Sequence, residues 1–281
     1  MMPGRGPGAR FVVRRRRSVL SVAIVLSAGA TTLHAQTDYY NTSAGRPLRI
    51  EDAGPVEYHA MELDLAPLRI ERLGGRTRHW SIHPETTIGI FPRTQLQIGA
   101  PFSYIDVAGS AAQGVAGLEI ATLYSFNAET AIPALALAAD VSLPVGSLAG
   151  EATYGTLKAI LTRTLPGIRF HANFQMTAGP STPSPDEASE ATVVDSRETS
   201  RWMGGVAVDR TFPLRSLLIS AEAFAEQPLR SEQAIAWSAG AGLRYQLSPR
   251  WAMDAGGGRR FTGDDRTWYV TLGSAYAFGL R

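Results

Sequence analysis

The chain has 281 residues, of which 44% are hydrophobic and 19% are charged, and it contains no cysteine. The absence of cysteine excludes a disulfide framework, a thiolate metal site and a cysteine nucleophile. The formal net charge is +2, but six arginines and no acid lie in the first 35 residues, which leaves 21 basic against 25 acidic side chains. The apparent basicity therefore belongs to the leader, and nucleic-acid binding loses its main support.

Residues 1–35 are expected to form a secretory signal peptide that is cleaved before Gln36. Arg14–Arg17 provides the positive n-region, Ser18–Ala30 is a short apolar stretch, and Ala35 is a small residue at the cut. The alternative, a transmembrane anchor, needs about 20 apolar residues, and this stretch is too short. Residues 36–55 are then expected to form a periplasmic N-terminal segment, and the exported protein is expected in the outer membrane of a Gram-negative cell.

Beyond the leader, apolar and polar residues alternate with period two, which is the signature of β-strands. Between Leu135 and Leu143, for example, every second residue is apolar, and the residues between them are Ala, Asp and Ser. The alternation fails once, around Pro67, where a β-bulge is expected. About twelve segments, each near the ~10-residue length of an outer-membrane strand, share the pattern: 57–70, 79–91, 95–106, 116–126, 132–143, 155–165, 168–178, 201–212, 216–226, 234–247, 251–261 and 266–279.

The face opposite the apolar one is rich in Gly, Ala, Ser and Thr with isolated charges, which suits a narrow lumen inside and lipid outside. A soluble barrel would reverse the two faces, and the period alone does not separate these alternatives. The leader and the alternating turn lengths separate them, and both favour the membrane barrel. The expected fold is therefore an all-β, transmembrane antiparallel β-barrel of about 12 strands over residues 56–281, after a cleaved signal peptide.

Tight connections rich in Pro or Gly follow the second, sixth, eighth and tenth segments, as short hairpins require. Longer polar connections lie between them, and this alternation is typical of outer-membrane barrels with short periplasmic turns. The longest connection, 179–200, contains three Pro and an excess of acids. It is either a disordered linker between domains or a long extracellular loop, and the loop is favoured because the strand period resumes beyond it.

Aromatic residues gather near the segment ends, where two interfacial girdles are expected, although strands also favour aromatic residues in general. The residues concerned are Trp80, Phe91, Tyr104, Trp202, Phe212, Trp237, Tyr245, Trp251, Trp268, Tyr276 and Phe278.

Several stretches resemble a known family: RPLRIEDA (46–53), HPE (83–85), GIFPRTQLQIGAPFSY (89–104), DVSLPVG (140–146) and GLRYQLSPRWAMDAGGGRRFTGDDRTWYVTLGSAYAFG (242–279). Together they resemble bacterial outer-membrane proteins assigned as transporters to the meta-degradation (MetA) pathway of phenol. The resemblance spans most of the exported chain, and the stretch near the C-terminus is its most distinctive part. It implies an outer-membrane β-barrel for the uptake of small or aromatic compounds.

Charged side chains on the inner faces are the candidate functional residues, because Arg or Lys facing lipid at the midplane costs about 2–4 kcal/mol. They either form a salt-bridge network that closes the pore or line a selective path. The candidates are Glu62, Asp64, His83, Glu85, Asp140, Lys158, Arg169, His171, Asp209, Glu222, Arg244, Asp254 and Arg260.

No metal ion or cofactor is expected. His79, His83 and Glu85 share one face of a strand, but only His83 and Glu85, about 6.6 Å apart, are near enough to act together. A lumen hydrogen bond or charge pair is favoured there on ligand count. Hydrolase, Walker and Rossmann motifs are missing, and Gly256–Gly258 is interpreted as room for strand curvature or for a bulky neighbour.

The expected function is passage or binding of small molecules, including aromatic or hydrophobic ones, and the chain is not expected to be an enzyme. The alternatives are a non-conducting barrel with a structural or surface-interaction role and, less favoured, a barrel enzyme. The expected partners are outer-membrane lipid, a small-molecule solute and the barrel-assembly machinery. Nucleic acid is excluded, and a monomer is expected.

We expect protease added to whole cells to cleave first within the loop at 179–200, because polar loop tips without apolar anchors are the preferred sites of nicking. The flanking strands should resist, since a closed sheet is fully hydrogen-bonded. Immunoblotting of the fragments checks this. Cleavage seen only after the outer membrane is permeabilised would invert the proposed topology.

Overall fold

The structure, a computed structural model, describes residues 46–73, 77–107, 110–181, 200–229, 234–262 and 267–280. The chain divides into two compact units, residues 1–32 and 33–281, and every described residue belongs to the second unit. The expected signal peptide and residues 182–199 of the expected loop lie outside the described residues. Within the described ranges, no helix has the length and apolar character needed to cross a membrane.

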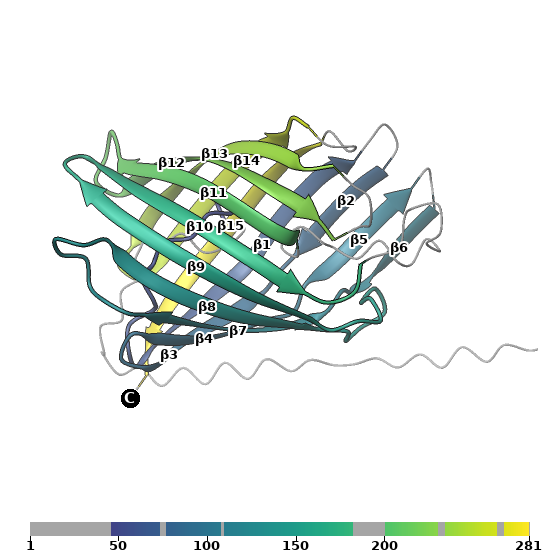
Figure 1. Cartoon of the computed structure of the whole chain (residues 1–281), viewed down its shortest axis with the longest axis horizontal. Helices are drawn as coiled ribbons and strands as arrows, with labels where there is room; N and C mark the ends of the chain where they lie inside the picture. The colour runs from purple at the N-terminus through teal and green to yellow at the C-terminus, as the bar shows by residue number, and fades with distance from the viewer. Residues whose placement is uncertain are drawn as a thin grey trace, which may run out of the picture. The chain divides into compact units, whose positions relative to one another are not determined.

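The described residues form one antiparallel sheet of fifteen strands that closes on itself, because β1 pairs with β15 (Figure 1). The strands are β1 (Ala60–Leu73), β2 (Thr77–Ile82), β3 (Glu85–Phe91), β4 (Thr94–Gly99), β5 (Phe102–Val107), β6 (Ser110–Val115), β7 (Leu118–Ser125), β8 (Ala134–Leu143), β9 (Tyr154–Leu165), β10 (Ile168–Ala178), β11 (Ser200–Thr211), β12 (Leu217–Pro228), β13 (Ala236–Ser248), β14 (Trp251–Arg260) and β15 (Trp268–Gly279).

Three of the expected strands are each interrupted once, which reconciles fifteen strands with twelve. β2 and β3 pair with the two halves of β1, and β4–β5 and β6–β7 continue one another in the same way. Proline cannot donate to a ladder, and two of the breaks contain one, Pro84 and Pro101. The breaks lie side by side, since Ala100 N donates to Pro84 O at 3.2 Å and Ala116 N donates to Pro101 O at 2.8 Å. The predicted closed antiparallel barrel of about twelve strands is confirmed.

The closing pair runs the length of β1, from Ala60 opposite Gly279 to Arg72 opposite Trp268. Its register shifts between Leu65 and Leu68, which confirms the bulge expected near Pro67. Because each strand pairs antiparallel with the next, all the tight connections lie at one end of the barrel, as their spacing in the chain predicts.

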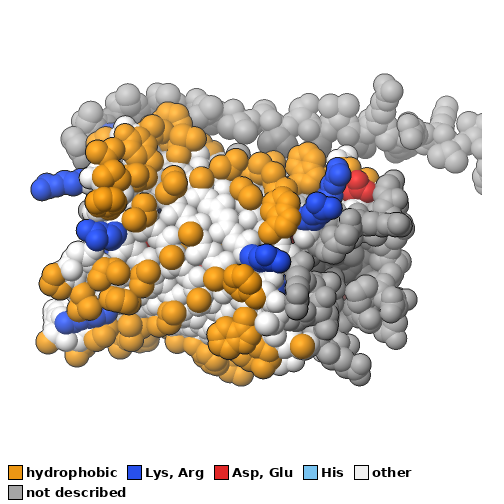
Figure 2. Space-filling view, turned by 90° about the horizontal axis from the view of Figure 1, so that it is seen from above, with side chains coloured by type: hydrophobic (Ala, Val, Ile, Leu, Met, Phe, Trp, Pro, Cys, Tyr) orange, Lys and Arg blue, Asp and Glu red, His pale blue; other side chains and the backbone are white. Residues whose placement is uncertain are grey.

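Burial follows the period of two that the sequence shows. Along β15 exposed and buried residues alternate, and the exposed ones, such as Val270 and Leu272, are 40% and 48% exposed. On β8 the apolar residues Leu135 and Leu137 point outward in the same way. Figure 2 shows hydrophobic side chains spread over the outer wall and basic side chains mostly toward its ends. Such a wall fits lipid, since an apolar outer band is the mark of a membrane barrel.

The N-terminal segment, residues 46–56, differs from its expected place. It was assigned to the periplasm with the rest of 36–55, but the structure places it against the inner wall of the barrel, where Leu48 is 2% and Ile50 0% exposed. Its apolar residues find a core there that they would lack in water. Residues 36–45 of the same expected segment lie outside the described residues.

We predict that Leu137→Arg reduces the amount of folded barrel in the membrane, because its side chain faces outward and a lipid-facing arginine costs about 2–4 kcal/mol. The measurement is the heat-modifiable band on a gel. Ala138→Ser, one residue away on the inner face, is the matched control and should assemble normally. Equal tolerance of both changes would show that the faces are misassigned.

Candidate functional site in the barrel lumen

Side chains of the barrel wall satisfy the backbone of the N-terminal segment. Glu222 accepts hydrogen bonds from Arg49 N at 2.7 Å and Ile50 N at 3.0 Å. Asn173 accepts from Glu51 N at 2.7 Å and donates to Glu51 O at 2.9 Å. Because buried backbone amides must be paired, and residues 49–51 lie outside the strands, the wall supplies the partners that a sheet would otherwise give.

Two more wall side chains continue the same pattern toward the start of β1. Thr162 Oγ1 accepts from Ala53 N at 2.9 Å, and Gln95 Oε1 accepts from Val56 N at 2.8 Å. These contacts come from β9 and β4, so the segment is held from several sides of the lumen.

Ion pairs hold the charged side chains of the segment. Arg46 pairs with Asp64 and, at 3.2 Å, with Asp254. Although burial by itself lowers the pKa of the Arg46 guanidinium, these two carboxylates together with Glu85 and Glu62 more than offset the effect and raise that pKa above its ordinary value. Arg49 pairs with Glu226 at 2.7 Å. Buried charges persist only when paired, so removing one partner is costly.

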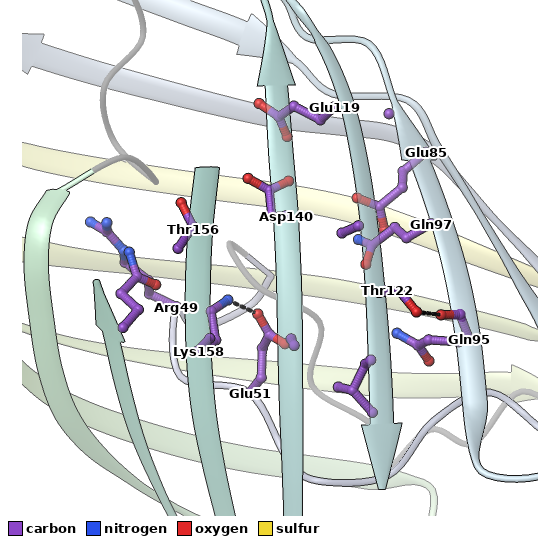
Figure 3. Close-up of a pocket in the computed structure, with 15 residues that line it drawn as sticks. Arg49, Glu51, Glu85, Gln95, Gln97, Glu119, Thr122, Asp140, Thr156 and Lys158 are labelled. Carbon is purple, nitrogen blue, oxygen red and sulfur yellow. Dashed lines mark hydrogen bonds and ion pairs between the residues drawn. The ribbon is translucent and has the colours of Figure 1, made fainter. Parts of the chain in front are cut away.

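Further along the segment, Glu51 pairs with Lys158 of β9 (Figure 3). Asp52 lies 3.8 Å from Arg169. The segment thus carries two positive charges followed by two negative ones, and each lies near the opposite sign on the wall.

Apolar contacts accompany the ionic ones. Leu48 and Ile50 pack with Met203, Ala207 and Phe224 in one buried cluster. Ala53 belongs to a second cluster with Leu123, Ala136 and Ile160 of the wall.

Glycines make the space that the segment occupies. A Cβ on Gly242 would lie 2.5 Å from Pro47 Cβ, and one on Gly256 would lie 2.5 Å from the Pro47 carbonyl oxygen. A Cβ on Gly258 would lie 2.5 Å from the Tyr269 hydroxyl. The Gly256–Gly258 run therefore gives room to bulky neighbours, one of the two interpretations that its sequence allows.

The predicted site residues fall into two groups. Most of them belong to the network around the segment. Four contact the segment directly: Asp64, Lys158, Glu222 and Asp254. Arg169 lies 3.8 Å from Asp52, and Arg260 shares Glu226 with Arg49. The remaining members pair with each other, Arg244 with Glu62 at 3.6 Å and His171 with Asp209. The other three are at or near the cavity beside the segment: Glu85, which lies opposite Asp64 across β1 and β3, and Asp140 line it, and His83 pairs with Glu119 of its lining.

His171 lies within a buried chain of hydrogen bonds. Its Nε2 is 3.0 Å from Asp209 Oδ2, and its Nδ1 is 3.0 Å from Thr162 Oγ1. Arg169 holds the same carboxylate through two bonds of 2.9 and 2.8 Å. A hydroxyl, an imidazole and a carboxylate in series can serve nucleophilic catalysis. Here the hydroxyl also accepts from Ala53 N, so the chain of bonds acts as an anchor for the segment.

His83 pairs with a carboxylate, which is the kind of contact that the sequence favours. The carboxylate belongs to Glu119 and not to Glu85, the residue that the sequence suggests. His83 Nε2 lies 3.3 Å from Glu119 Oε2, across from Glu85. Within the described ranges, no three His, Asp or Glu side chains lie close enough together to hold a metal ion.

A cavity remains beside the segment, toward β3, β4, β7, β8 and β9 (Figure 3). It contains about 860 Å³ of empty space, including the part open to solvent. Four carboxylates and two basic groups line it, together with amides, hydroxyls and a few small apolar residues. The labelled side chains are Arg49, Glu51, Glu85, Gln95, Gln97, Glu119, Thr122, Asp140, Thr156 and Lys158.

Sequence reasoning missed the segment's own residues as part of the site. The sequence predicts Arg46, Arg49, Glu51 and Asp52 in the periplasm, and it does not single out Glu226 on β12, the partner of Arg49. The sequence does contain one signal: four charged residues next to Leu48 and Ile50 form a stretch that needs both ion partners and a core. The glycines on the inner face of β13 and β14 leave the space in the wall that this stretch occupies.

We predict that Gly242→Ala lowers the free energy of unfolding of the barrel by about 1–3 kcal/mol, because the new Cβ overlaps Pro47 in a packed site. Urea unfolding in detergent measures the change. Gly155→Ala is the matched control, since a Cβ there meets nothing within 4 Å. If both variants lose the same stability, the fit between wall and segment does not matter for folding.

Residues 86–278 match the model of a family described as "Putative MetA-pathway of phenol degradation". Among proteins of curated function, no sequence match was found.

Two solved structures show what the fold is similar to. The COG4313 outer membrane channel from Pseudomonas putida F1 superposes with a TM-score of 0.58 at 12% identity, over 81% of this chain and 98% of that one. The NanC porin superposes with a TM-score of 0.51 at 8% identity, over 75% and 99%. At such identities the likeness establishes the fold, whereas the family model covers more than half of the chain. The chain is an outer-membrane β-barrel and belongs to the MetA-pathway family of phenol degradation.

Proposed function

We propose that this barrel is a channel for small solutes, which pass through the cavity beside the N-terminal segment. The observation that carries the proposal is that the segment fills only one side of the lumen. Toward β3, β4, β7 and β8 a cavity that is partly open to solvent remains, and charged and amide side chains line it together with Ala and Leu. A polar lining replaces part of the water around a solute, which passage through a narrow pore requires.

The lining favours small molecules that carry a hydrogen-bonding group. Gln95, Gln97 and Glu119 offer acceptors and donors, while Leu123 and Ala138 contribute to the apolar surface of the lining. A phenol, with one hydroxyl on a small apolar ring, fits both kinds of group. The description of the family, which concerns phenol degradation, supports the same class of solute.

The non-conducting barrel is the second candidate, and the network around the segment is the observation that favours it. Arg46 and Arg49 each pair with a buried carboxylate from the wall. A segment tied in this way closes its own side of the lumen permanently. Electrical conductance separates the two candidates, because a sealed barrel passes no current.

We propose further that residues 1–35 direct export, that the barrel-assembly machinery inserts the chain, and that it acts as a monomer. The pairing of β1 with β15 supports the last point, since it removes the two strand edges through which a second copy could otherwise pair. We propose no enzymatic activity: the solved structures reported above are a channel and a porin.

We predict that Ala121→Trp reduces single-channel conductance in planar bilayers by about half or more, because the indole enters the cavity and narrows the path. Ala121 lines the cavity from β7. Ala139→Trp on the neighbouring strand is the matched control, because by the alternation of β8 Ala139 shares the outward face with Leu137. Its conductance should equal that of the unmodified barrel.

Uptake of phenol into proteoliposomes, measured with the same variants, connects conductance to the solute. It should fall with Ala121→Trp and not with Ala139→Trp. Barrels that show the heat-modifiable band but no current steps would support the non-conducting alternative. An equal loss with both variants would place the path elsewhere.

A further inference from the structure

Basic residues form a row on the outer wall at the end of the barrel opposite the tight turns. Arg259 of β14 lies opposite Trp268 of β15, Trp268 opposite Arg72 of β1, and Arg72 opposite Arg78 of β2. Directly opposed residues of an antiparallel pair share one face, so these four side chains stand next to one another on the outside. All three arginines are exposed, and Trp268 is 45% exposed.

Among the described residues, the three guanidinium groups have no ion-pair partner, although Asp106 lies opposite Arg78 on β5. Arg72 and Arg78 face each other directly, with Cβ atoms about 5 Å apart, and like charges so placed are destabilising. A bound anion would convert this repulsion into attraction.

Apolar and aromatic side chains lie below the row, toward the middle of the barrel. Val270, Ile70 and Trp80 follow one another there, each about 40–47% exposed. Trp80 contacts Tyr104 of β5, with ring centroids 5.1 Å apart. Apolar band, aromatic girdle and then basic row is the order in which a membrane presents acyl chains, interface and headgroups.

The row lies in the leaflet that faces the outside. In barrels of this kind the short turns are periplasmic, and the longer connections are extracellular. Arg72, Arg78 and Arg259 are each one residue from the extracellular end of their strands. The lipids that surround this end of the barrel therefore belong to the outer leaflet.

We propose that Arg259, Trp268, Arg72 and Arg78 form a binding site for a phosphorylated lipid of the outer leaflet. The arginines contact its phosphate groups, and its acyl chains lie over Val270, Ile70 and Trp80. Charge complementarity selects this occupant, because guanidinium groups recognise phosphate oxygens with paired hydrogen bonds. The row spans three neighbouring strand pairs, or about 15 Å. That span suits a lipid with two phosphates better than a single free anion.

Native mass spectrometry of the purified barrel in uncharged detergent tests the site, with bisphosphorylated lipid A as the probe and its dephosphorylated form for comparison. At about 1 kcal/mol for each basic residue, R72Q should weaken binding roughly fivefold and R72Q/R78Q roughly thirtyfold. The matched control is R210Q, which removes an exposed outer-face arginine at the opposite end of the barrel. Its affinity should be unchanged.

Thermal unfolding provides a second readout that does not depend on detecting the complex. Without lipid, R72Q/R78Q should unfold at the same temperature as the parent or higher, because a like-charge pair is removed. With lipid A, the parent should gain more stability than the double variant, since a ligand stabilises the state that binds it.

Three results would overturn the proposal. The first is an equal loss of binding with R210Q, which would show general attraction to a basic protein. The second is equal affinity for the dephosphorylated lipid, which would show that acyl chains alone are recognised. The third is displacement of the lipid by excess inorganic phosphate alone, which would show a free-anion site.

Discussion

A charged chain segment can remain inside a closed barrel only if its ions and its backbone amides all find partners, because water reaches few of them there. This constraint organises the lumen. Glu222 accepts hydrogen bonds from two backbone amides of the segment. Asp64 and Asp254 both form ion pairs with the guanidinium of Arg46. The wall charges that the sequence displays are therefore mainly the counterpart of residues 46–56.

The segment divides the lumen into two unlike halves. On the side of β11–β14, glycines and a small apolar cluster around Leu48 and Ile50 pack against it with no room to spare. On the side of β3–β9, carboxylates and amides surround an open cavity. A salt-bridge network and a polar path were alternatives at the level of sequence, and they coexist in space: the network fixes the segment, and the segment forms one wall of the path.

The outer surface obeys a separate constraint, because period two lets the two faces of a strand vary independently. Inward residues contact the segment or the cavity, and outward residues face lipid. On β1, Glu71 is buried inside, while its neighbours Ile70 and Arg72 face outward. One strand thus contributes both to the lumen network and to the row of arginines at the membrane surface.

The alternation, the turn chemistry and the bulge at Pro67 are local properties of the chain. The sequence alone therefore determined the barrel of about twelve strands, its two faces and its connections. The same reasoning found Asp64, Glu222 and Asp254 as inward charges. It did not find their partners, because Arg46 and Asp254 are 208 residues apart and no periodicity links an irregular segment to a wall. Only the tertiary structure placed residues 46–56 inside. Their burial depends on a space that exists only once β1 has closed on β15 and the glycines of β13 and β14 face inward.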